Sequence, residues 1–220
     1  MTLYIIATPI GNLKDITLRA LEILGKVDLV LAEDTRKTGQ LLSHYKISKP
    51  LESLHEHNEE RKIPSLLERL KNTEIALVSD AGTPLLSDPG FKLVREAIAK
   101  GIKIESIPGP SAVLTALTSS GLPTNQFLFL GYLPKSTGKQ KETLDFVDRV
   151  TKDRPTTVIF FESPYRIKKT LELLAAKFPE KEVAIARELT KLHEEIIRGK
   201  VSEVAKRNIF PKGEFTVLLY

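Results

Sequence analysis

Short apolar segments alternate with amphipathic helical segments through the first half of the chain, and this alternation constrains the fold most. Strand-like segments occur at residues 3–7, 27–33, 75–79 and 102–108. Residues 15–26 and 90–101 carry apolar side chains at helical spacing, with Asp15 as the expected N-cap and Gly25 and Gly101 as the expected ends. The pattern predicts a mostly parallel α/β sheet whose ligands gather beyond the carboxyl ends of the strands.

The second half predicts another α/β unit, richer in consecutive strands. Chain-breaking residues flank a small-residue helix within residues 108–126, so we expect domains at 1–115 and 116–220. The expected strands are 127–131, 156–162, 183–188, 193–199 and 214–219, and the expected helices lie near 139–151, 164–177 and 201–208.

Composition excludes several classes of protein. Hydrophobic residues make up 41% of the chain and charged residues 28%, which is ordinary for a globular protein. No apolar run reaches the ~18 residues of a membrane span, and the first residues read as a strand rather than a signal peptide. There is no cysteine, so neither a disulfide nor a thiolate metal site is available. We expect a cytosolic protein that makes no membrane contact.

The formal net charge of +5 is unevenly distributed. Residues 1–120 contain 15 basic and 15 acidic side chains, whereas residues 121–220 contain 18 and 13. One interpretation is a surplus that only keeps the protein soluble. The other is a phosphate-bearing partner such as RNA.

Three loops rich in small residues follow predicted strands. They read ATPIGN (7–12), SDAGTPLLSDPG (79–90) and PGPSA (108–112). At one edge of a sheet, such loops let backbone groups approach a ligand closely. None has the spacing of a P-loop or of a dinucleotide fingerprint, which argues against a triphosphate and against a nicotinamide dinucleotide.

The sequence gives no indication of a metal site. His55 and His57 flank Glu56, and on a strand the two imidazoles would share a face, but no third ligand stands at metal spacing. A solvated or hydrogen-bonded pair near the active cleft is the preferred interpretation.

Several longer blocks, spread from residue 4 to residue 217, carry a family resemblance. In order they are YIIATPIGNLKDIT, AEDTR, HEHN, LVSDAGTPLLSDPG, IPGPSA, FFESPYRI, ARELTKLHEE and KGEFTV. Together they resemble the tetrapyrrole methylase superfamily, and within it the small-subunit ribosomal RNA methyltransferase I branch, which 2′-O-methylates a cytidine in the decoding region.

The resemblance implies two α/β domains of a non-Rossmann methyltransferase, with S-adenosylmethionine in the interdomain cleft, and a homodimer acting on 16S rRNA or the small ribosomal subunit. ATPIGN stands where tetrapyrrole-modifying members have a glycine-rich loop, which disfavours a small-molecule methylase. A cofactor-binding ribosome assembly factor without turnover is the remaining alternative. Longer members of the branch continue past KGEFTV, so the chain is either a naturally short form or lacks a C-terminal extension.

The resemblance also implies a set of cofactor-binding residues. They are Pro9, Ile10, Gly11, Asp80, Ala81, Gly82, Thr83, Ser111, Ala112, Phe161, Glu162, Glu214 and Phe215. Two of them have ordinary structural alternatives, because Phe161 suits a core strand and Ser111 suits a helix N-cap.

Catalytic and RNA-contacting residues are expected beyond strand ends in each half. Glu188 or Asp34 is expected to orient or deprotonate the ribose 2′-OH. The residues expected to contact RNA are Arg36, Tyr165, Arg166, Arg187 and Lys191. Internal Glu–Arg salt bridges are the alternative for the charged residues, and packing at a helix start is the alternative for Tyr165.

Overall fold

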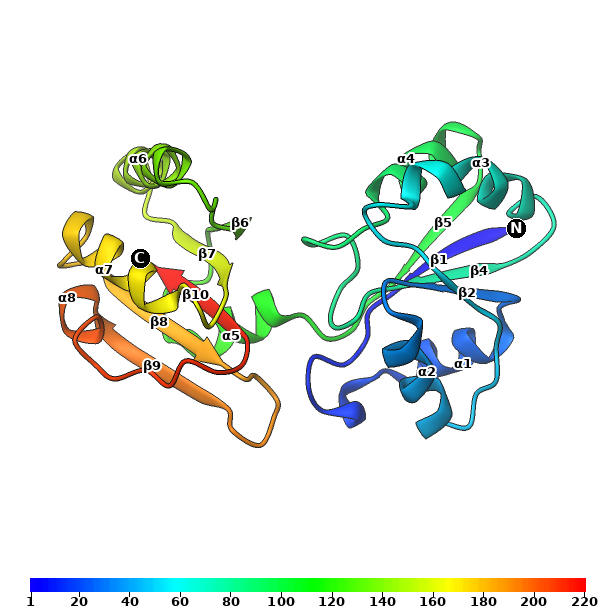
Figure 1. Ribbon diagram of the computed structural model, residues 1–220, viewed down its shortest axis with the longest axis horizontal. Coiled ribbons are helices and arrows are strands. Elements are labelled where there is room, and N and C mark those ends of the chain that lie inside the picture. The colour runs from blue at the N-terminus through cyan, green and yellow to red at the C-terminus, as the bar shows by residue number, and fades with distance from the viewer. The chain divides into compact units, whose positions relative to one another are not determined.

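A computed structural model describes residues 1–220 and divides the chain into two compact units, Met1–Ser111 and Ala112–Tyr220 (Figure 1). The boundary lies four residues before the predicted one, because helix α5 (Ala112–Ser120) belongs entirely to the second unit. Its buried side chains Val113, Ala116 and Leu117 face that unit's own strands.

The first unit is built on a fully parallel five-stranded sheet, as the alternating pattern predicts. The strands, in the order in which they lie side by side, are β3 (Leu51–Ser53), β2 (Leu29–Ala32), β4 (Ile75–Val78), β1 (Thr2–Ile6) and β5 (Lys103–Ile107). Four of these match predicted strands. The three-residue β3 was not predicted.

Helices cover both faces of this sheet (Figure 1). They are the 3₁₀ helix η1 (Leu13–Asp15), α1 (Leu18–Lys26), α2 (Thr35–His44), α3 (Glu59–Arg69) and α4 (Phe91–Ala99). Side chains alternate along the strands, so that Leu31 joins a core with Leu66 of α3, while Val30 joins a core with Leu24 of α1. Both faces of the parallel sheet are therefore buried, as βαβ crossovers require.

Two predicted helix limits are wrong. Thr17, not Asp15, caps α1, because its side chain accepts a hydrogen bond from the Ala20 N–H (3.1 Å), while Asp15 lies in η1. Gly25 lies inside α1, which runs on to Lys26. Gly101 does follow α4, with a left-handed φ of +73°.

The second unit contains a mixed sheet with a single core. Its strands lie in the order β6 (Phe127–Tyr132), β7 (Thr157–Glu162), β10 (Phe215–Leu219), β8 (Glu182–Arg187) and β9 (Glu195–Lys200). Only β6 and β7 are parallel. The remaining helices are α6 (Thr137–Asp153), α7 (Ile167–Lys177) and α8 (Val201–Val204). No helix in either unit has the length and apolar character needed to span a membrane.

Candidate active site

The three small-residue loops meet at the carboxyl edge of the first sheet and are joined by hydrogen bonds. Thr8 and Gly82 form a two-way backbone bridge, each N–H donating to the other's carbonyl at 2.9 Å. Thr83 Oγ1 donates to the carbonyl of Pro110 (3.1 Å). The loops after β1, β4 and β5 therefore form one rigid group.

Small residues are required where these loops touch. Gly82 has φ +84°, and a Cβ there would lie 3.2 Å from Ile10 Cγ2. A Cβ on Gly109 would lie 3.0 Å from the Cβ of Ala7. The wall formed by these loops consequently consists largely of backbone, which suits close approach of a ligand.

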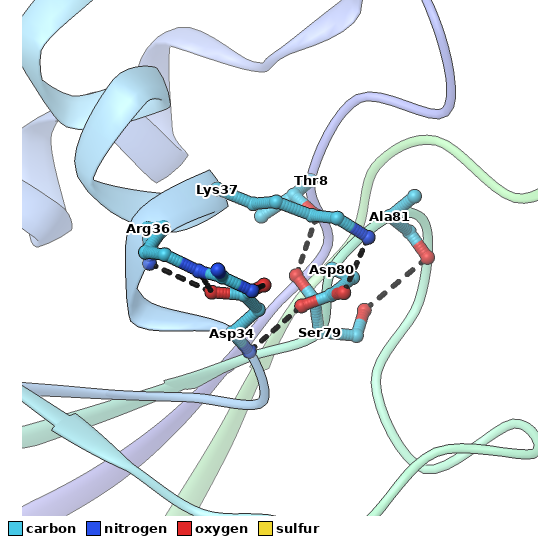
Figure 2. Close-up of polar contacts among 7 residues, drawn as sticks. All are labelled: Thr8, Asp34, Arg36, Lys37, Ser79, Asp80 and Ala81. Atoms are coloured by element: carbon cyan, nitrogen blue, oxygen red, sulfur yellow. Dashed lines mark hydrogen bonds and ion pairs between the residues drawn. The ribbon is translucent and has the colours of Figure 1, made fainter.

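Asp80 links this edge to the start of α2 (Figure 2). Its Oδ1 accepts from the Asp34 N–H (2.9 Å), and its Oδ2 pairs with Lys37 Nζ (2.7 Å). Thr8 Oγ1 donates to the Ser79 carbonyl at 3.2 Å. Asp80 was expected to meet the ligand, and both of its oxygens already have partners within the protein.

A cavity of about 180 Å³ lies beside this network and is lined in part by Thr8, Pro9, Lys37, Ser79 and Asp80. Ligand pockets usually measure ~300–1,000 Å³. The cavity is thus large enough for part of a nucleoside-sized ligand. Three of these lining residues, Thr8, Lys37 and Ser79, were missed by sequence reasoning.

Asp34 caps helix α2 and holds Arg36. Its Oδ1 accepts from the backbone N–H of Arg36 (2.9 Å), and its two oxygens bind the guanidinium at 3.0 and 2.7 Å. These hydrogen bonds from Arg36 lower the pKa of Asp34 to about 2. A carboxylate with so low a pKa is a weak proton acceptor.

Two further carboxyl groups near this edge have raised pKa values. Burial, reinforced by the charge of Glu33, raises the pKa of Asp88 to about 7, although a hydrogen bond with Ser79 opposes the shift. Burial, followed by the charge of Asp80, raises the pKa of Glu33. The sequence does not reveal either shift, because both arise mainly from burial in the folded protein.

His55 and His57 lie between β3 and α3 rather than on a strand, so they do not form the shared strand face that a strand would give them. Their ring centroids are 6.0 Å apart, and the buried Nδ1 of His55 has no hydrogen-bond partner. The structure brings together no group of three or more His, Asp or Glu side chains that could hold a metal ion.

Glu188 belongs to a compact polar cluster in the second unit. It accepts from Lys191 Nζ (2.9 Å) and from the Glu214 N–H (3.0 Å), and Lys191 also pairs with Glu214 (2.9 Å). Burial favours a higher pKa for Glu188, but these hydrogen bonds outweigh it and lower that pKa. Glu188 has a φ of +52°, so its backbone is in the left-handed region.

Gly213 makes this cluster possible and was not predicted. Its φ is +95°, and a Cβ there would lie 2.5 Å from side-chain atoms of Glu188. The signal in the sequence is the Gly immediately before Glu214 in KGEFTV.

Arg187 is held within the second unit. Its Nε pairs with Glu195 (3.1 Å), and its guanidinium lies 5.6 Å from the centroid of the Phe210 ring. Its side chain is only 12% exposed. Arg187 and Lys191 both form salt bridges within the second unit, which was the alternative interpretation for these residues.

Glu162 is buried, and its carboxylate has three partners. These are Arg166 Nη2 (2.7 Å), Thr170 Oγ1 (2.7 Å) and the Ser163 N–H (2.7 Å). Its neighbour Phe161 is partly buried and packs edge-to-face on Phe129, with ring centroids 5.0 Å apart. The carboxylate of Glu162 is therefore engaged within the second unit.

The other residues expected in the site differ in their burial. Phe215 is buried in the core of the second unit and pairs in register with Glu162 and Arg187. Ser111 is buried directly before α5, of which Ala112 is the first residue. Tyr165 is 96% exposed. The predicted residues thus form two groups, one at the sheet edge of each unit.

Comparison with known proteins identifies the relatives of this chain. The model of the tetrapyrrole (corrin/porphyrin) methylases matches residues 2–205. A protein of Thermotoga maritima named "Ribosomal RNA small subunit methyltransferase I" is 47% identical over 220 residues, covering 99% of this chain and 97% of its own. Proteins of the same name from Halalkalibacterium halodurans and a Hydrogenobaculum species are 46% and 48% identical, covering 99% and 100% of this chain and 75% and 95% of their own.

The fold has a known counterpart as well. The crystal structure of a diphthine synthase matches 100% of this chain and 90% of its own, with a TM-score of 0.79 at 18% sequence identity. At that identity the likeness concerns the fold alone.

Proposed function

Because this chain belongs to the tetrapyrrole methylase family, in the branch of the small-subunit ribosomal RNA methyltransferases I, we propose that it transfers a methyl group from S-adenosylmethionine to small-subunit rRNA. More finely, we propose the 2′-oxygen of a cytidine ribose in the decoding region as the acceptor. The observation that carries the proposal is the 47–48% sequence identity to relatives of that name over nearly the whole chain.

The residues of the first unit fit the proposed cofactor. S-adenosylmethionine is a nucleoside with an amino-acid tail, and when bound it supplies an already activated methyl group. The backbone wall of Gly82, Ala81 and Pro110 offers close approach, and Lys37 places a cation beside the cavity. We assign the ATPIGN, SDAGT and PGPSA loops to the cofactor. Whether it also meets the second unit, as the family resemblance implies, stays a prediction.

What the protein must add is alignment of the acceptor oxygen, exclusion of water and removal of one proton. Alignment contributes most, since effective molarities of oriented groups reach ~10⁵–10⁸ M. The hydrogen-bonded loops provide the rigidity that alignment needs. Asp34 and Glu188 are better suited to orient the 2′-OH than to deprotonate it, because their partners lower both pKa values.

The direct test uses radiolabelled S-adenosylmethionine and small ribosomal subunits that lack the modification. We expect label on one ribose, identified by nuclease digestion and mass spectrometry. Label on a base, or on no RNA at all, contradicts the proposal. Transfer to a tetrapyrrole would indicate a small-molecule methylase, and cofactor binding without transfer would indicate an assembly factor.

Asp34→Asn and Glu188→Gln test the proposed orienting roles. Each variant keeps its shape and loses its charge. We expect reduced kcat with unchanged cofactor affinity, measured by calorimetry. Methyl transfer at the wild-type rate in both variants would remove these residues from the reaction.

We also propose that the protein is a homodimer, on the family resemblance alone. Sedimentation equilibrium decides this, and a monomer at micromolar concentration contradicts it.

A further inference from the structure

Two segments of the second unit leave the same end of its sheet. Strands β6 and β7 are parallel neighbours, so residues 133–141, which follow β6, and residues 163–169, which follow β7, begin side by side. Arg166 joins them, because its Nη1 donates to the Leu133 carbonyl (2.9 Å) while its Nη2 pairs with Glu162. We call these two segments the lysine surface.

The lysine surface holds the excess positive charge of the chain. It contains six basic residues and no Asp or Glu, whereas the whole chain has a net charge of +5. Without these two segments the chain would carry −1. The basic residues are Lys135, Lys139, Lys141, Arg166, Lys168 and Lys169.

Four of these cations have no internal partner. Lys135, Lys139, Lys168 and Lys169 are exposed, and no carboxylate lies within ion-pair distance of any of them. Elsewhere in the same unit, Lys152 pairs with Asp148 (2.8 Å) and Lys200 with Glu180 (2.7 Å). Unpaired cations attract a polyanion most strongly, because their charge is not already neutralised.

A bare aromatic ring stands among these lysines. Tyr165 is 96% exposed and contacts no other aromatic ring. A Tyr ring beside lysines is the combination by which proteins bind single-stranded nucleic acid, with phosphates on the cations and a base on the ring. An acidic protein partner would pair with the lysines but would have no base to stack on the Tyr165 ring.

We propose that the lysine surface binds a single-stranded segment of the rRNA substrate, with Lys135, Lys139, Lys168 and Lys169 on phosphates and Tyr165 stacked on a base. The proposal rests on the proposed function for the identity of the RNA. It replaces the expected phosphate contacts of Arg36, Arg187 and Lys191, whose guanidinium and ammonium groups pair with Asp34, Glu195, Glu188 and Glu214.

The binding test measures fluorescence anisotropy of a 20-nucleotide single-stranded RNA of mixed sequence at several salt concentrations. The test variant replaces Lys135, Lys139, Lys168 and Lys169 with Ala. A matched control replaces Lys26, Lys46, Lys100 and Lys206, which are also exposed. At ~0.7 per phosphate contact, we expect the slope of log K against log salt to shrink by about 3 in the test variant only.

Tyr165→Ala should weaken binding roughly 5- to 150-fold, and Tyr165→Phe should leave it unchanged, because stacking is worth ~1–3 kcal/mol per base. Equal losses in the two quadruple variants would overturn the proposal, as would wild-type binding by Tyr165→Ala. Competition by polyglutamate as strong as by RNA would also overturn it. Circular dichroism of each variant verifies the fold.

Methyl transfer to small ribosomal subunits separates this proposal from the proposed function. If the wild type transfers no methyl group, the proposed function is wrong, while the oligonucleotide data still test RNA binding by the lysine surface. If the wild type is active, we expect the test variant to raise KM for the subunit with cofactor affinity unchanged. An unchanged KM overturns the proposal and leaves the function standing.

Discussion

At the scale of single residues, the polar side chains of the candidate site are held by other parts of the protein. Asp80, Asp34, Glu162 and Glu188 each bind a cation or a backbone N–H of the chain itself. Sequence reasoning recognised these residue types beside strand ends but could not show which pairs form, because even partners two to four residues away are set by the folded geometry. Asp80, for example, follows β4 while Lys37 lies in α2, and the two meet only in the folded protein.

Gly213 is a small residue whose replacement we expect to destabilise the second unit. Gly213→Ala forces a side chain into a left-handed conformation and against Glu188, so stability should fall by ~1–3 kcal/mol. Gly138→Ala in α6 is the control, because nothing lies within 4 Å of its added Cβ and Ala favours a helix by ~0.5–1 kcal/mol. Urea denaturation compares the two. Equal stability of both variants would show that the loop before β10 adapts freely.

Asp88 gives stability a pH dependence with a definite sign. Its folded pKa of about 7 lies above its ordinary value of 3.8, so the folded state holds the proton more tightly than the unfolded state. Stability should therefore fall as pH rises from 4 to 7, with a slope for this group of at most ~1.4 kcal/mol per pH unit. Asp88→Asn should flatten that part of the profile, as followed by urea denaturation between pH 4 and 8. A profile parallel to that of the wild type would contradict the assignment.

At the scale of elements, the strands were predictable and several helices were not. Most predicted strands, such as residues 75–79, contain a continuous apolar run, which suits a buried sheet, whereas 102–108 and 193–199 are interrupted by charged residues. Helix α2 escaped prediction because Asp34 was read only as a functional carboxylate, although it stands where an N-cap would. Helix α3 contains Pro64, which argues against a helix in any local reading, and β3 has only three residues.

The start of α1 provides an element-scale prediction. Asp15 and Thr17 are both capping types, and only the folded geometry shows that Thr17 accepts the Ala20 N–H. Thr17→Ala should destabilise the protein by ~1 kcal/mol. Asp15→Ala should change stability by less than ~0.5 kcal/mol, because Asp15 is exposed. Thermal denaturation compares the stabilities of the two variants. A larger loss of stability in Asp15→Ala than in Thr17→Ala would indicate that Asp15 is the cap.

At the scale of the whole molecule, the two units have cores that share no residue. The buried clusters of the first unit draw only on residues 3–107, and the cluster of the second unit draws only on residues 133–219. The alternation of strands and helices predicted two α/β units, but not that the second sheet is mostly antiparallel. Strand direction there depends on how β8, β9 and β10 pair across the chain, which local patterns do not encode.

Separate cores predict separate unfolding, and two matched substitutions test this. Leu66 on α3 and Leu174 on α7 are both fully buried, one in each unit. Each Leu→Ala change removes the same atoms and should cost ~2–5 kcal/mol in its own unit. In native-state hydrogen exchange, Leu174→Ala should lower the protection of amides in β7, β8 and β10 by that amount and leave β1 and β4 unchanged. Leu66→Ala should do the reverse. Equal loss of protection in both units, from either variant, would mean that the chain unfolds as one cooperative body, because the free energy of each core would then stabilise the other.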